Sequence, residues 1–134
     1  MMHGWPYDAH CYLDVMALLA AKGVRSIAPF LRGYGPTRFL SDATMRSGEQ
    51  AAIGADLLAL MDALSIETAT VAGFDWGGRA ACIATAVAPE RVTGLVSCGV
   101  GYNIQGIARA NDPGPVEEEA RYWYIYLFHP ERGR

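Results

Sequence analysis

The stretch GFDWGG, residues 73–78, decides the fold, because it joins a predicted strand to a predicted helix through a glycine-framed turn. The β-branched run TATVAG, 68–73, predicts the strand. The small-residue run that follows predicts a helix over about Gly78–Ala88. A polar side chain at the centre of such a turn is held exposed above the sheet. Asp75 is therefore a candidate nucleophile, although an aspartate here also suits a helix cap.

Two further helices are expected before this turn. The first covers about Ala9–Lys22, with Asp8 as its cap and Gly23 just past its end. Ser47 and Gln50 fit the S-x-x-Q capping box that begins the second. An apolar stripe at helical spacing then follows, formed by Ile53, Leu57, Leu60, Met61 and Leu64.

Strands are expected between these helices, at 24–30 and at 92–100. Alternating helices and strands predict an α/β fold, with a parallel sheet covered by helices on both faces. We expect this core to occupy residues 1–100 and residues 101–114 to form a linker. Residues 115–134 then begin a second, helical segment, since proline and three glutamates favour its first turn.

Composition narrows the function classes. The chain has 134 residues and a formal net charge of -3. It shows no Lys/Arg stripe, so a nucleic-acid partner is not expected. No apolar run reaches the length of a membrane span and no signal peptide is visible, so we expect a cytoplasmic protein without a membrane partner. Cys11, Cys82 and Cys98 are widely spaced and form no C-x-x-C pair, so we expect buried reduced thiols rather than a zinc site. No metal or cofactor is expected.

Three more motifs accompany the turn, in a fixed order along the chain. They are HGWP at 3–6, LRGYGPT at 31–37 and PERV at 89–92. Together with residues 73–78 they resemble the α/β-hydrolase superfamily, and within it the epoxide hydrolases and the related haloalkane and fluoroacetate dehalogenases. The resemblance covers essentially the whole chain. It implies a partial α/β-hydrolase fold, with residues 115–134 as the first helix of its lid.

The resemblance also implies roles for individual residues. Asp75 would be the nucleophile, and the backbone N–H groups of Trp5 and Trp76 would form the oxyanion hole. His3 would be structural rather than the catalytic base. The supporting motif positions are His3, Gly4, Pro6, Gly73, Gly77 and Gly78.

Aspartate in the nucleophile position narrows the chemistry. Attack by a carboxylate on an acyl carbon would give an anhydride, whereas attack on an sp³ carbon gives an alkyl ester that water can cleave. Small hydrophobic epoxides or alkyl halides are therefore the expected substrates. In the resembling epoxide hydrolases, two lid tyrosines donate to the epoxide oxygen, and Tyr124 in RYWYIYLF matches the first of them. Packing of an aromatic helix on the main domain is the alternative for Tyr124.

Dehalogenation is the alternative reaction, because Trp76 could also stabilise a leaving halide and D-x-G-G-R, ending at Arg79, is similar to the fluoroacetate dehalogenases. The motif HGWP favours the epoxide hydrolases.

The resemblance implies a histidine and an acid after the lid. His129 is the only histidine after Asp75, and neither it nor Glu119 fits the family pattern. The strand expected before HGWP is represented by Met1 and Met2 alone. We therefore expect a chain truncated at both ends. The parent would be an epoxide hydrolase, and the alternative for this chain is a catalytically inert fragment.

Overall fold

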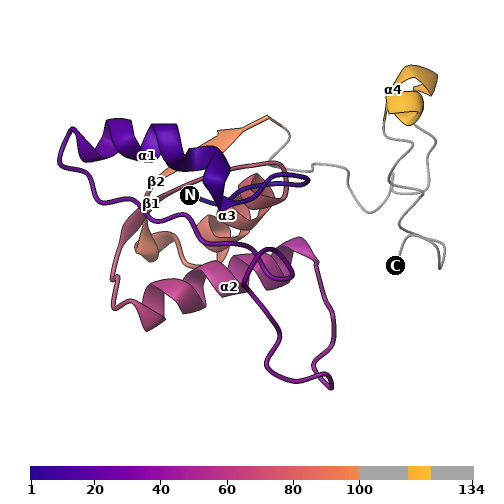
Figure 1. Ribbon diagram of the computed structural model, residues 1–134, viewed down its shortest axis with the longest axis horizontal. Helices are drawn as coiled ribbons and strands as arrows, with labels where there is room; N and C mark the ends of the chain where they lie inside the picture. Colours follow the sequence, from indigo (N-terminus) through magenta and orange to yellow (C-terminus); the bar gives the residue numbers. More distant parts are fainter. Residues whose placement is uncertain (100–114, 122–134) are drawn as a thin grey trace. The chain divides into compact units, whose positions relative to one another are not determined.

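The computed structural model describes residues 1–99 and 115–121 (Figure 1). The chain divides into two units, Met1–Asn103 and Ile104–Arg134. The first contains η1 (Ala9–Tyr12), α1 (Leu13–Ala20), α2 (Gln50–Ala63), β1 (Ala69–Phe74), α3 (Asp75–Val87), η2 (Pro89–Arg91) and β2 (Val92–Cys98). The second contains α4 (Val116–Arg121), directly after Pro115 as the sequence predicts. The predicted linker at 101–114 lies outside the described residues.

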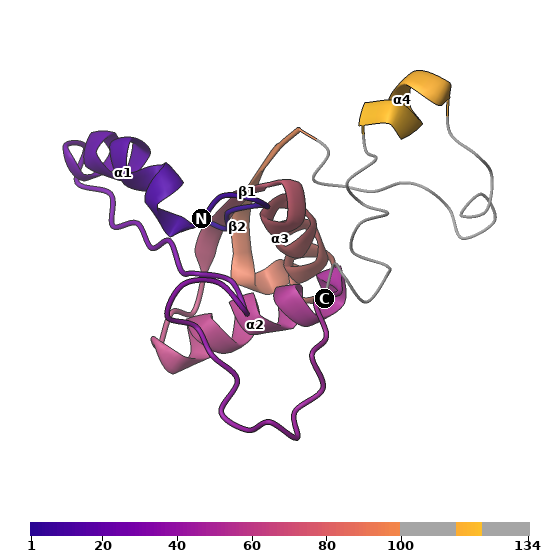
Figure 2. The same cartoon turned by 45° about the vertical axis from the view of Figure 1, so that its right-hand side comes forward.

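The two described strands form a parallel sheet in which β1 pairs with β2 from Ala69↔Val92 to Phe74↔Cys98. The connection between them is α3, which packs against both strands, and α2 packs against α3 (Figure 2). This is the strand–helix–strand unit that the sequence predicts around residues 73–78.

Residues 24–30, predicted as a strand, are not part of a sheet among the described residues. A strand needs a neighbour to complete its ladder, and here the neighbouring segment is very short. The amino group of Met1 donates to Ile27 O at 2.7 Å, and Met2 forms an isolated parallel bridge to Gly73. Met1 and Met2 therefore lie between residues 24–30 and β1, where the resemblance places the strand before HGWP.

Two helix starts differ from the sequence prediction. The capping box is wrong, because α2 begins at Gln50 with Glu49 as its N-cap and no side chain caps it. Arg32 donates to Ser47 O at 2.9 Å and to Ala52 O at 3.1 Å, so the backbone before α2 is fixed by this guanidinium instead. The Asp8 cap is confirmed, since its carboxylate accepts from His10 N at 2.8 Å. However, the first turn after Asp8 is the 3₁₀ helix η1 rather than α-helix.

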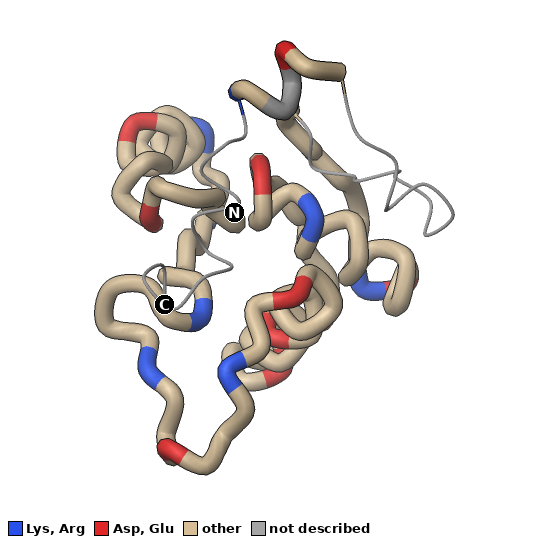
Figure 3. The backbone as a smooth tube through the Cα atoms, turned by 90° about the vertical axis from the view of Figure 1, so that its right-hand side faces the viewer, with Lys and Arg blue, Asp and Glu red and all other residues tan. Residues whose placement is uncertain are grey.

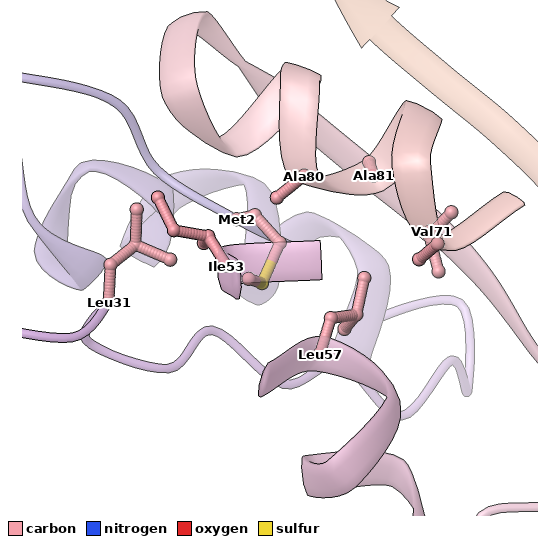
Figure 4. Close-up of a cluster of buried hydrophobic side chains, with 8 residues drawn as sticks. Met2, Leu31, Ile53, Leu57, Val71, Ala80 and Ala81 are labelled. Carbon is pink, nitrogen blue, oxygen red and sulfur yellow. The ribbon is translucent and has the colours of Figure 1, made fainter. Parts of the chain in front are cut away.

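The hydrophobic core lies between α2, α3 and the start of the chain. Figure 4 shows Met2 and Leu31 beside Ile53 and Leu57 of α2, with Ala80 and Ala81 of α3 nearby. Of the predicted α2 stripe, Ile53, Leu57 and Met61 are buried, whereas Leu60 is half-buried and Leu64 is exposed. The small residues of α3 allow it to approach α2 and β1 closely.

Basic and acidic positions are interspersed along the backbone (Figure 3), and two arginines tie loops to α2. Arg32 makes a bidentate pair with Asp56, with both N···O distances at 2.6 Å. Arg91, in the PERV corner, donates to Asp62 at 2.7 Å, to Glu67 O at 2.7 Å and to Ile66 O at 3.0 Å. Planar arginine donors suit such multiple contacts.

The cysteine prediction is partly wrong. Cys11, Cys82 and Cys98 are free thiols, but Cys11 and Cys98 are exposed and only Cys82 is half-buried. Cys11 lies in η1, which faces solvent over most of its surface, and Cys98 ends the edge strand β2. Among the described residues, no helix combines the length and apolar character needed to cross a membrane.

Candidate active site

Asp75 lies at the point where β1 ends and α3 begins, and its backbone is in the left-handed region with φ +51°. A non-glycine residue in this region costs about 1 kcal/mol or more, and such strain is concentrated at functional sites. The helix-cap alternative is wrong. The N-cap of α3 is Phe74, and no side chain makes a capping hydrogen bond there.

The Asp75 carboxylate instead faces the start of the chain. Trp5 N donates to Asp75 Oδ1 at 2.9 Å, across 70 positions of sequence. The Trp5–Pro6 peptide bond is cis. The HGWP loop and the 73–78 turn therefore meet at the carboxylate, and one of its oxygens is oriented by a backbone N–H.

Three glycines make this approach possible. A Cβ on Gly4 would lie 2.4 Å from Asp75 Cβ, and a Cβ on Gly77 would lie 2.0 Å from Met2 O. A Cβ on Gly73 would lie 2.4 Å from Gly77 O. Contacts this short do not occur with real Cβ atoms, so any side chain at these positions would push the loop away from the turn.

His3 stabilises the HGWP loop through contacts of its ring nitrogens with backbone groups. It is completely buried; Leu31 N donates to its Nε2 at 3.1 Å, and its Nδ1 lies 3.2 Å from Gly4 O. Nε2 must accept, so the proton is on Nδ1 and the ring is neutral. Burial lowers the pKa of His3, which agrees with that tautomer. Since both ring nitrogens are occupied by backbone groups, the geometry fits a structural residue rather than a base.

Tyr34, in the RGYG loop, also lies near the carboxylate. Its ring meets the His3 ring edge-on, with centroids 4.8 Å apart. Burial raises the pKa of the Tyr34 hydroxyl, and the negative charge of Asp75 raises it further. The LRGYGPT motif therefore reaches the same site as HGWP and residues 73–78.

The side chain of Trp76 packs against the hydrophobic core, and the Arg79 guanidinium lies 4.5 Å above its ring. This cation–π contact orients the first turn of α3. The predicted role of the Trp76 N–H in the oxyanion hole stays a prediction.

Comparisons with known proteins show the family of the chain. Residues 1–128 match the alpha/beta hydrolase fold family. The chain belongs to that family. It is 33% identical to an epoxide hydrolase of Caballeronia sordidicola over 97% of this chain and 38% of that protein. It is 34% identical to epoxide hydrolase 3 of Siraitia grosvenorii over 76% of this chain and 32% of that protein.

Solved structures that superpose with this chain also include epoxide hydrolases. A candidate epoxide hydrolase from Klebsiella pneumoniae is 49% identical and superposes with a TM-score of 0.90, covering 98% of this chain and 43% of that protein. An epoxide hydrolase from an endophytic Streptomyces is 30% identical with a TM-score of 0.75, covering 98% of this chain and 39% of that protein. The chain therefore spans less than half the length of these relatives.

The predicted lid residue Tyr124 lies outside the described residues. His129 and the side chain of Glu119, which do not fit the family pattern, are not described either. The described part holds Asp75, the HGWP loop and the RGYG loop. It contains no cluster of three or more side chains that could hold a metal ion.

A cavity of about 550 Å³ opens elsewhere, between residues 29–44 and α2. Asp75 and Trp5 are not in its lining, whereas the Arg32–Asp56 pair is. That pair is already satisfied by its own hydrogen bonds, so we do not assign the hydrolase site to this cavity.

The sequence prediction missed Tyr34 and Tyr7 as neighbours of the site. Tyr34 lies inside a motif that was identified, but only the tertiary approach of two loops brings it to His3. Tyr7 directly follows HGWP, and its ring lies 5.7 Å from that of Phe74, the residue before the nucleophile position. Adjacency to the motifs is the signal that could have identified both.

Proposed function

We propose that this chain carries the alkylation half of an epoxide hydrolase. The observation that supports this most directly is the Asp75 carboxylate, on a strained strand-to-helix turn with Oδ1 held by Trp5 N–H. In the proposed step, Asp75 Oδ2 attacks an epoxide carbon. That carbon's bond to the ring oxygen breaks, its electron pair stays on the oxygen, and the oxygen takes up a proton. The product is a hydroxyalkyl ester of Asp75.

The Trp5 N–H would serve both half-reactions. Before attack it fixes the plane of the carboxylate, which leaves Oδ2 as the attacking atom. When water later adds to the ester, the same donor would stabilise the oxyanion, with Trp76 N–H as the second donor. On the resemblance alone, we assign the proton for the epoxide oxygen to the Tyr124 hydroxyl.

We propose further that these 134 residues lack the base for ester hydrolysis. The sequence contains three histidines. His3 is buried with both nitrogens engaged, and His10 pairs with Asp8 at 3.0 Å. His129 does not match the family pattern. A small hydrophobic epoxide is the proposed substrate, without a cofactor, and location in the cytoplasm stays a prediction.

Incubation with styrene oxide, followed by intact-mass and peptide mass spectrometry, tests the proposal. We expect peptide mapping to locate an adduct on Asp75 that persists without diol formation, separate from any adduct on the exposed thiols of Cys11 and Cys98. Asp75→Asn should form no adduct, and asparagine tolerates the positive φ and can still accept from Trp5 N–H. A folded protein without any adduct would refute Asp75 as the nucleophile. Catalytic diol formation would refute the missing base, and bromide release from 1-bromobutane would favour the dehalogenase alternative.

A further inference from the structure

We infer that Tyr7 and Phe74 form an aromatic wall beside Asp75, and that the site therefore prefers epoxides carrying a flat aromatic group. This inference rests on the proposed function, because it concerns the substrate that Asp75 would attack. We define the aromatic wall as the side chains of Tyr7 and Phe74.

The chain connects this wall to the carboxylate from two sides. Phe74 directly precedes Asp75, and Tyr7 follows two residues after Trp5, whose N–H donates to Asp75 Oδ1. The Tyr7 and Phe74 rings are 5.7 Å apart at an interplanar angle of 73°. A group attached to an epoxide on Asp75 would thus start next to an edge-to-face aromatic pair.

The exposure of Tyr7 distinguishes it from its neighbour Tyr12. The Tyr12 ring also lies near Phe74, with centroids 5.9 Å apart, but its hydroxyl donates to Met2 O at 2.9 Å. Tyr12 is half-buried, and this burial raises the pKa of its hydroxyl to about 12. Tyr7 is 58% exposed. The Tyr7 ring is therefore accessible to a bound molecule, and aromatic side chains commonly line ligand sites.

The physical basis of the preference is the charge distribution of aromatic rings. Aromatic pairs in edge-to-face or offset geometry gain stabilisation beyond that of the apolar area they bury, because the ring edge is positive and the face negative. A cyclohexyl group buries similar area but lacks this contribution. The extra stabilisation of an aromatic pair corresponds to a rate difference between about twofold and tenfold.

The experiment compares (2,3-epoxypropyl)benzene with (2,3-epoxypropyl)cyclohexane, whose reacting carbons are alike. The rate of Asp75 adduct formation is followed by peptide mass spectrometry, which separates it from adducts on Cys11 and Cys98, and is divided by the rate of each epoxide with free acetate. We expect the normalised ratio to favour the aryl epoxide about threefold or more. Tyr7→Leu should bring the ratio near one, whereas Tyr7→Phe should retain it. Leu18→Ala, at an exposed apolar position of α1, should leave it unchanged.

Failure of this inference is distinguishable from failure of the proposed function. If neither epoxide alkylates Asp75 in folded protein, the proposed function fails and the inference fails with it. If both alkylate at equal normalised rates, or the preference persists in Tyr7→Leu, the aromatic wall is refuted and the proposed function stands. Circular dichroism of Tyr7→Leu and Phe74→Leu verifies that each variant is folded.

Discussion

At the scale of single residues, the site depends on glycines, whose lack of a Cβ atom leaves room for the HGWP loop to approach Asp75. Gly4 and Gly77 lie against Asp75 and Met2 so closely that a methyl group at either position has no space. The contacts are with backbone and with the Cβ of Asp75, neither of which can rotate away. These glycines therefore set the distance between Trp5 N and the carboxylate. The secondary-structure propensities of the residues do not predict this distance.

Gly77→Ala should destabilise the protein by about 2–3 kcal/mol or more, because its Cβ would lie 2.0 Å from Met2 O. Gly48→Ala is the matched control, since nothing lies within 4 Å of a Cβ there, and should stay within about 0.5 kcal/mol of wild type. Urea unfolding of the three proteins measures both values. Equal stability of the two variants would contradict the close approach of the loop and the turn.

His3 should make stability depend on pH. Burial lowers its pKa in the folded state below the ordinary 6.5, so below that pH the unfolded chain binds a proton that the folded chain does not. Its contribution is therefore present above pH 6.5 and is lost as the pH falls from 6.5 toward the folded pKa, by at most about 1.4 kcal/mol per pH unit.

Unfolding free energies at pH 7.5 and 5.5 measure this effect as a difference from His3→Gln. A His3→Gln variant with an unchanged slope would show that His3 does not titrate as its burial indicates.

At the scale of elements, the strand–turn–helix around Asp75 could be predicted from sequence, because glycine spacing and β-branched residues are local signals. The start of α2 and the pairing of residues 24–30 could not be predicted in this way. The start of α2 depends on Arg32, which reaches the Ser47 and Ala52 carbonyls from 15 and 20 positions away. Likewise, residues 24–30 have a strand-like sequence, but pairing is decided by what lies beside them rather than by their own composition.

Arg32→Lys tests the element-level role of the Arg32–Asp56 pair. Lysine cannot reproduce the two parallel N–H···O bonds or the contacts to both carbonyls. We expect a loss of about 1–3 kcal/mol in unfolding free energy. Arg25→Lys, at an exposed position, should be close to neutral. A neutral Arg32→Lys would mean that the loop before α2 is fixed by other contacts.

At the scale of the whole molecule, we expect the free energy of local opening to differ between parts of the first unit. Val71, Ala80, Ala81 and Ala84 are almost fully buried, whereas residues 41–46 are exposed and make local hydrogen bonds. Few buried contacts correspond to a low free energy of local opening.

Amide hydrogen exchange should therefore show slow exchange in β1 and α3 and fast exchange over residues 41–46. Peptide-level mass spectrometry resolves these segments, which lie far apart in sequence. Equal protection of the two regions would contradict the buried cluster of Figure 4 as the most stable part of the unit.

The glycine contacts also have a consequence for laboratory evolution. Libraries at positions 4, 73 and 77 should consist almost entirely of unfolded variants, because every substitution meets backbone or Asp75. Position 7 is more than half exposed and position 74 is half-buried, so both accept replacement. If Asp75 acts as proposed, saturation mutagenesis of Tyr7 and Phe74 should change the epoxide preference in variants that still fold.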